Sequence, residues 1–116
     1  MATPQIESYR FGQIVIDGQT YNKDVIVLPD GVRPNWWRTE GHRLGREDLD
    51  AVFEADLEVL VVGRGAFGRM WVPDEVGQAV REAGMALIAQ PTKQAVATYN
   101  RLRGSRAIAA ALHLTC

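Results

Sequence analysis

The stretch LEVLVVGRG, residues Leu57 to Gly65, decides the fold class of this chain. Its first six residues are nearly all apolar, as expected for a strand that is covered on both faces. A second buried strand is predicted from Met85 to Ala89. Between and after these strands, apolar residues at helical spacing predict one helix that begins at Pro73 and another that is capped by Thr92. Strands and helices that alternate at this spacing predict βαβ units with right-handed crossovers.

The first half of the chain is predicted to form short antiparallel strands. Asp17-Gly18 is a strong hairpin turn signal, and Pro29-Asp30-Gly31 turns the chain again. The third strand should lie at a sheet edge, because Pro34 cannot donate a ladder hydrogen bond. The strands are predicted at Phe11 to Ile16, in the run that ends at Leu28, and from Arg33 to Arg38.

The last segment, RAIAAALHLT from Arg106 to Thr115, fits two structures. Its alanines prefer a helix, whereas its length and apolar continuity allow a buried strand. Either reading leaves the same fold class. We predict a single α/β domain over residues 1–116, with three layers and an N-terminal antiparallel hairpin.

Composition and charge limit the classes of binding partner and the cellular location that we expect for this protein. The 116 residues carry 13 basic and 14 acidic side chains, so the net charge of −1 predicts neither a nucleic-acid nor a membrane partner. The single cysteine, Cys116, excludes an intrachain disulfide. The first ten residues resemble no targeting segment, so we expect a cytoplasmic protein.

Three motifs along the chain are similar to those of a known family. They are EVLVVGRG at Glu58 to Gly65, the helix A-V-x-T-Y-N at Ala95 to Asn100, and the HLTC terminus. Their order resembles the small Mth-type domain family over nearly the whole chain. That family includes an adipogenesis-associated protein and, more distantly, a mitochondrial factor that helps to assemble respiratory complex I. Arg64 stands where a smaller residue is usual in the family.

The resemblance implies a central mixed β-sheet with helices on its faces, and a final strand at Ala107 to Leu114. It also implies that no enzyme activity is to be presumed, and we predict no catalytic residues, no metal and no cofactor. Where a role is known in the family, it is protein–protein assembly. We therefore predict a non-catalytic interaction or assembly module that binds a protein partner or associates with itself.

The candidate protein interface comprises Trp36, Trp37 and Arg38. Adjacent residues on an extended strand face opposite ways, so burying one tryptophan tends to expose the other. An exposed tryptophan beside arginine has the composition of an interface hot spot. The alternative is that both tryptophans pack under the N-terminal hairpin.

The alternative function is that of a binding protein or an enzyme for a small molecule, an anionic metabolite, which uses a crevice beside Gly63 to Gly68. This loop matches G-x-G-x-x-G, but its helix begins too late for a dinucleotide site and no acidic residue ends the next strand. Ligands still favour this end of an open α/β sheet. The turn itself does not require the side chain of Arg64. The candidate ligand residues are Gly63, Arg64, Gly65, Gly68, Thr92 and His42.

Three further sites are weighed and not predicted. His113 and Cys116 suit zinc, with His42 as a third ligand, but residues i and i+3 on a strand point to opposite faces. A nucleophile–base pair of Ser105 or Cys116 with a histidine lacks a visible orienting carboxylate. Two arginine-rich segments suggest nucleic-acid binding, but acidic residues dilute the first and a helix end accounts for the second.

Overall fold

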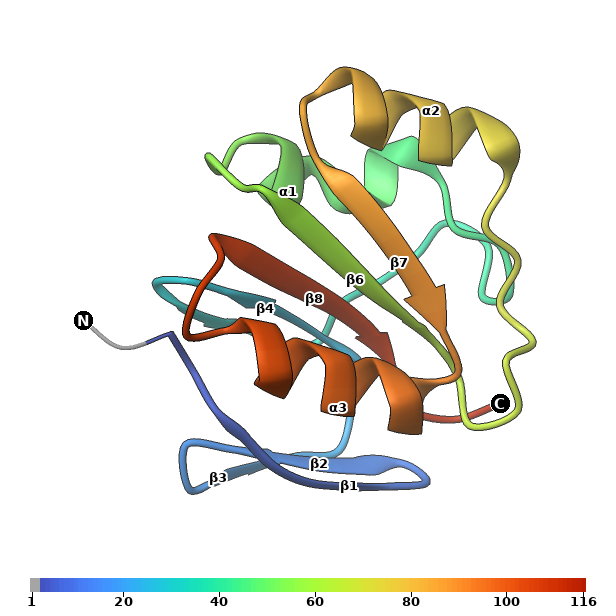
Figure 1. Cartoon of the computed structure of the whole chain (residues 1–116). Coiled ribbons are helices and arrows are strands. Elements are labelled where there is room, and N and C mark those ends of the chain that lie inside the picture. The colour runs from blue at the N-terminus through green and yellow to red at the C-terminus, as the bar shows by residue number, and fades with distance from the viewer. Residues whose placement is uncertain (1–2) are drawn as a thin grey trace.

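A mixed β-sheet of five strands forms the central layer of the computed structural model, which describes residues 3–116 (Figure 1). Its order is β5-β4-β8-β6-β7. Strands β8, β6 and β7 are parallel, whereas β4 runs antiparallel to both β8 and β5. The bounds are β4 Val25–Leu28, β5 Gly31–Arg33, β6 Val59–Arg64, β7 Ala86–Gln90 and β8 Ile108–His113.

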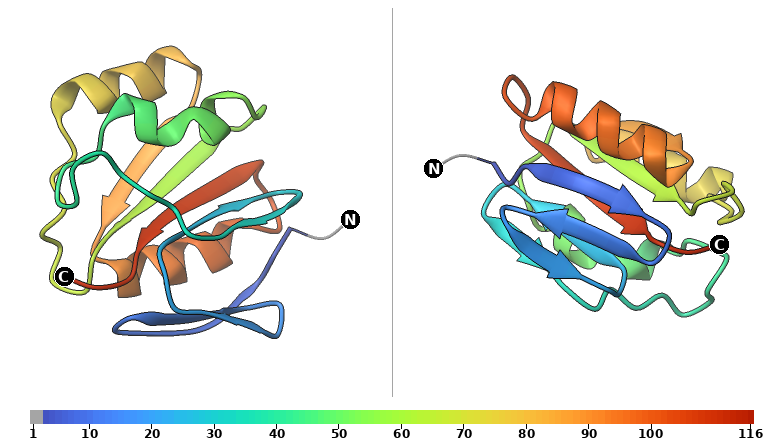
Figure 2. Two further views of the ribbon diagram at one scale, coloured as in Figure 1. Left: turned by 180° about the vertical axis from the view of Figure 1, so that it is seen from behind. Right: turned by 90° about the horizontal axis from the view of Figure 1, so that it is seen from below.

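Two hydrophobic clusters cover the two faces of this sheet and define three layers (Figure 2). One face packs against η1 (Arg46–Leu49), α1 (Asp50–Phe53) and α2 (Asp74–Glu82). The other packs against α3 (Thr92–Leu102) and an N-terminal sheet. Strands β6 and β8 contribute buried side chains to both clusters, which is why their sequences are continuously apolar. The predicted three-layer α/β domain with a mixed sheet is confirmed.

The N-terminal sheet has three antiparallel strands in the order β1-β2-β3. They are β1 Ile6–Arg10, β2 Gln13–Ile16 and β3 Gln19–Tyr21. The predicted turn joins β2 to β3, with positive φ at both Asp17 (48°) and Gly18 (80°). The sequence interpretation missed β1. It also treated β3 and β4 as one run, although the chain leaves one sheet and enters the other between them.

Two uncertain segments of the sequence are resolved by the sheet. The chain end is strand β8 and not a helix, because its alanines are buried between the two clusters. The strand predicted from Arg33 to Arg38 is wrong. The edge strand β5 ends at Arg33, and beyond Pro34 the chain turns away at Asn35, whose φ is +57°. No helix of the described residues is long and apolar enough to cross a membrane.

Candidate binding site beside Trp37

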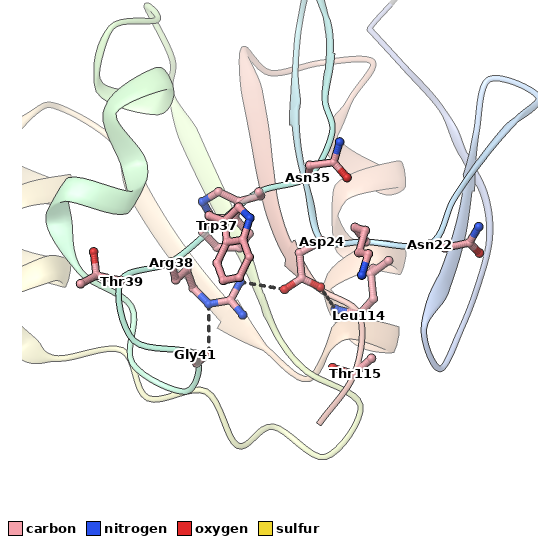
Figure 3. Close-up of a pocket in the computed structure, with 11 residues that line it drawn as sticks. Asn22, Asp24, Asn35, Trp37, Arg38, Thr39, Gly41, Leu114 and Thr115 are labelled. Atoms are coloured by element: carbon pink, nitrogen blue, oxygen red, sulfur yellow. Dashed lines mark hydrogen bonds and ion pairs between the residues drawn. The ribbon is translucent and has the colours of Figure 1, made fainter.

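A pocket of about 500 Å³ lies where the segment after β5 passes the start of β4 and the end of β8 (Figure 3). Its volume falls within the usual range for small-molecule sites in proteins. Aromatic and polar side chains share its walls. The lining residues are Asn22, Lys23, Asp24, Asn35, Trp36, Trp37, Arg38, Thr39, Gly41, Leu114 and Thr115.

A buried ion pair holds this pocket together. The side chain of Arg38 is only 6% exposed, and its Nη1 lies 2.8 Å from Asp24 Oδ2. Its Nε donates to the Gly41 carbonyl oxygen at 3.0 Å, and its guanidinium lies 4.7 Å from the centre of the Trp36 ring. Asp24 Oδ1 accepts from the backbone N–H of Leu114 at 2.8 Å. The pair therefore ties the Trp37 loop, defined here as residues 34–44, to β4 and to the end of β8.

His113 completes the cluster from the last position of β8. Its Nδ1 lies 2.8 Å from Asp24 Oδ2 and 3.0 Å from Arg38 Nη2. Because the ionised carboxylate only accepts and the guanidinium only donates, Nδ1 can serve one of them, and we assign its proton to the shorter bond with Asp24. In the neutral ring, Nε2 is then an acceptor, and it is buried without a hydrogen-bond partner in residues 3–116.

The pKa of Asp24 is lower than that of an ordinary aspartate. Burial on its own raises this pKa, but the hydrogen bonds from His113, Leu114 and Arg38 favour the charged form and outweigh burial. The carboxylate is therefore ionised in the folded protein at neutral pH. Its charge offsets that of the buried Arg38 guanidinium.

The free energy of unfolding should fall at acidic pH, because the Asp24 carboxylate becomes protonated. A depressed folded-state pKa contributes stability that is fully present above the unfolded pKa of about 3.9 and is lost as pH falls through the folded value. We expect the difference in unfolding free energy between wild type and Asp24→Asn to shrink below about pH 5. Urea titrations of both proteins at several acidic pH values measure it. A difference that stays constant down to the acid limit of folding would contradict this assignment.

The two adjacent tryptophans have different environments. Trp37 is 86% exposed, whereas Trp36 is half-buried and its Nε1 donates to the carbonyl oxygen of Asp48 at 2.8 Å. The alternative that both pack under the N-terminal hairpin is wrong. The reason for their opposite exposure also differs from the expectation, because these residues lie in a loop after the turn at Asn35 and not on a strand.

The glycine loop lies at the carboxyl end of β6 and contacts the end of the chain. Gly65 N–H donates to Thr92 Oγ1 at 2.9 Å, and Ala66 N–H donates to the carbonyl oxygen of Thr115 at 2.8 Å. The N–H groups of Gly68 and Thr92 both donate to the Gly65 carbonyl oxygen. The structure thus brings Gly65, Gly68 and Thr92 together, with these four backbone donors bonded within the chain.

The remaining candidate ligand residues have structural contacts of their own. A Cβ at Gly63 would lie 2.9 Å from Thr92 Oγ1, so this glycine permits close packing at the end of β6. Arg64 Nε donates to the Met70 carbonyl oxygen at 2.8 Å, so the expectation that the turn does not use this side chain is wrong. His42 is exposed, and its ring lies edge-on to that of His113 with 6.0 Å between centroids.

Thr92 does not cap its helix as the sequence interpretation expected. Pro91 occupies the N-cap position, and the Thr92 hydroxyl instead donates to the His113 carbonyl oxygen at 2.6 Å.

The nucleophile–base pair of Ser105 and His113 and the metal site that the sequence analysis weighed are not supported by the positions of these residues. Ser105 precedes β8 whereas His113 ends it, so this nucleophile–base pair is not formed. Among residues 3–116, no group of three or more His, Cys, Asp or Glu side chains is placed to hold a metal ion.

The sequence interpretation missed Asp24 and His113 as members of the site. They are separated by 89 positions along the chain, and although His113 begins the HLTC terminus, nothing in that motif points to Asp24. The sequence signal that the two residues share is that each stands at one end of an apolar run, Asp24 before VIVL and His113 after IAAAL. Antiparallel pairing of β4 with β8 brings these ends together, with Val25 opposite Leu112.

The fold and the site define a small three-layer α/β domain in which a buried charged cluster supports an open pocket. A family model described as "Protein of unknown function (DUF498/DUF598)" matches residues 6–113. The chain belongs to this family. The resemblance to the Mth-type domain family is confirmed, since the solved structures that share this fold include MT938 and a Mth938-like domain from Bordetella pertussis.

Solved structures match this chain over almost its whole length. A conserved hypothetical protein, PH1505 from Pyrococcus horikoshii OT3, is 30% identical, with a TM-score of 0.83 over 97% of this chain and 99% of that protein. A protein described as an outer membrane protein from Bartonella henselae is 25% identical, with a TM-score of 0.83 over 99% and 98% of the two chains. MT938 is 25% identical, with a TM-score of 0.79 over 98% and 100%.

Proposed function

We propose that this protein is a non-catalytic interaction module that binds a protein partner through the surface around Trp37. The observation that carries the proposal is the 86% exposure of this tryptophan at the edge of a preformed pocket. Truncating a tryptophan anchor at the centre of an interface commonly costs about 2 kcal/mol or more of binding free energy. Because the Trp37 side chain is largely exposed, it contributes little to the core or to its own loop. We therefore assign this side chain to contact with a partner.

The rigidity of the surrounding loop supports this proposal. Arg38 and Trp36, which flank Trp37, are held by the buried ion pair and by the hydrogen bond to Asp48. A side chain presented on a fixed backbone loses less conformational entropy on binding than one on a loose loop. Asn22, Lys23 and Asn35 place polar groups around the pocket, which matches the usual division of an interface into an apolar anchor and a polar rim.

The absence of a complete catalytic arrangement favours a binding role. The dyad of Asp24 and His113 has the form of an oriented general base, but no hydroxyl or thiol of residues 3–116 is hydrogen-bonded to His113 Nε2. The anion-binding alternative has less support, because the backbone donors of the glycine loop bond within the chain. As part of this proposal, the protein acts in the cytoplasm.

Photo-crosslinking at position 37 tests the proposal. We expect a photoreactive phenylalanine derivative in place of Trp37 to capture a specific protein in the native host. The same derivative in place of Phe67, which is 66% exposed on the glycine loop, is the matched control and should not capture it. Equal capture at both positions would contradict a surface centred on Trp37.

Binding of the purified partner provides the quantitative test. Trp37→Ala should raise the dissociation constant about 30-fold, corresponding to about 2 kcal/mol. Its melting temperature should stay close to wild type, because the side chain is largely exposed and packs little. Phe67→Ala should change the dissociation constant less than about fivefold. Unchanged affinity of Trp37→Ala for the captured protein would overturn the proposal.

A further inference from the structure

Strand β7 forms an open edge of the central sheet. Among residues 3–116 it pairs only with β6, and its outer side faces away from the sheet in Figure 1. Apart from that pairing and a bond from the Ala86 N–H to Glu58, no backbone hydrogen bond in residues 3–116 involves Ala86–Gln90. The outward N–H and C=O groups of this strand are therefore available to another strand.

This edge lacks the usual protection against strand addition. Natural edge strands carry lysine, proline or a bulge, or they are very short. The opposite edge follows this rule, since β5 has only three residues and one of them, Arg33, is charged. The sequence of β7, ALIAQ, has five residues with no charge, no proline and no register shift against β6.

The side chains of β7 are complementary to those of a second copy. Leu87 and Ile88 are half-buried, on opposite faces of the sheet, whereas Ala86 and Ala89 are exposed. Antiparallel pairing centred on Ile88 places Leu87 opposite Ala89 of the partner subunit. Large side chains then meet small ones on the α2 face, and the two Ile88 side chains meet on the α3 face.

Charges beside the strand match the same arrangement. A hollow of about 290 Å³ along β7 is lined by Leu87 and Ala89 together with Asp74 and Arg81 of α2. Asp74 begins that helix and Arg81 lies in its last turn. The two-fold axis of this arrangement passes between the two Ile88 residues, so the α2 helices of the two subunits run in opposite directions. Arg81 then faces Asp74 of the partner subunit, and Asp74 faces Arg81 of the partner subunit. Within residues 3–116, neither side chain has an ion pair.

We propose that β7 is a homodimerisation edge, at which a second copy of this chain pairs antiparallel about Ile88 and extends the sheet through both subunits. This interface is separate from the Trp37 surface, which lies beside β4 at the other side of the sheet. Dimer formation therefore leaves the Trp37 surface free on each subunit.

Register-specific disulfide formation tests the pairing. In a Cys116→Ser background, Ile88→Cys should give a covalent dimer on mild oxidation, because directly opposite Cβ atoms lie about 5 Å apart. Ala86→Cys is the control and should remain monomeric, since the two copies of position 86 are offset by roughly 13 Å along the strands. Equal crosslinking at both positions, or none at position 88, would overturn the proposed register.

A charge exchange tests the same interface without touching the strand. Sedimentation of wild type over a dilution series should show a monomer–dimer equilibrium. Arg81→Glu should raise the dimer dissociation constant roughly tenfold, because symmetry replaces two ion pairs with like-charge contacts. The double variant Arg81→Glu/Asp74→Arg should restore it, and Arg69→Glu on an exposed loop should leave it unchanged. A wild type that is monomeric at every concentration, or a double variant that is not rescued, would contradict the proposal. Trp37→Ala should dimerise normally, so the two proposals can fail independently.

Discussion

Replacing Asp24 by alanine should lower the free energy of unfolding by about 3–5 kcal/mol, the usual cost of removing one partner from a buried ion pair. The guanidinium of Arg38 is 6% exposed, so it would keep a desolvated charge without its carboxylate. The Leu114 N–H would lose its acceptor as well, and His113 would lose the partner that fixes its ring. Urea denaturation at neutral pH, followed by far-ultraviolet circular dichroism, measures the change.

A double-mutant cycle separates the loss of the Asp24–Arg38 ion pair from a general disruption of the site. Arg38→Met removes the charge and keeps an apolar side chain of comparable length beside Trp36. The combined variant Asp24→Ala/Arg38→Met should be more stable than the sum of the single effects predicts, because it leaves no unpaired charge in the interior. Strictly additive effects, or an Asp24→Ala variant within about 1 kcal/mol of wild type, would show that the pair does not hold the site.

The central strands were predictable, because a strand that is buried on both faces has a continuously apolar sequence. Strands β6 and β7 follow from LEVLVV and MALIA, and the Mth-type resemblance selected a strand for the alanine-rich end. That last choice was open on residue preferences alone, since alanine favours helices. Contact with both hydrophobic clusters stabilises β8 as a strand, and this contact exists only after the sheet has formed.

The missed strand β1 shows where sequence patterns fail. An exposed sheet should alternate apolar and polar residues, but in IESYR only Ile6 is fully buried. The pairing with β2 shifts register between Ile6 and Ser8, so the alternation is interrupted within five residues. The prediction of a strand from Arg33 to Arg38 shows the opposite error, because a strand was expected where the chain forms a loop. Its tryptophans suggested a strand, whereas the turn at Asn35 and the bonds of Arg38 fix a loop.

The candidate site was only partly predictable, because its core depends on topology. The opposite exposure of the adjacent tryptophans was expected from alternation along a strand, but it arises in a loop, so the outcome was predicted and its cause was not. The cluster of Asp24, Arg38 and His113 joins the start of β4, a loop and the end of β8, and no spacing in the sequence relates them. The antiparallel placement of β4 beside β8 brings Asp24 and His113 together, and the loop after β5 adds Arg38 through its bonds to Gly41 and Asp24.

Gly65→Ala should destabilise the protein by about 3 kcal/mol, through both its backbone and its side-chain environment. Gly65 has φ of +99°, in the left-handed region that favours glycine. An added Cβ would lie 2.7 Å from the Thr115 carbonyl oxygen and 2.9 Å from Cδ2 of His113. Because the first of these is backbone, relief requires the end of the chain to move, and the bond from Ala66 N–H to Thr115 would be strained or lost.

Two matched glycines divide this cost into its parts. Gly84 has a similar φ of +88° with no atom within 4 Å of an added Cβ, so Gly84→Ala measures the backbone term alone, about 1 kcal/mol. Gly104 has neither constraint, and Gly104→Ala should stay within about 0.5 kcal/mol of wild type. Urea denaturation of the three variants gives the comparison. If Gly65→Ala costs no more than Gly84→Ala, the packing of the chain end and His113 against the glycine loop contributes nothing to stability, and the loop is held by its backbone conformation alone.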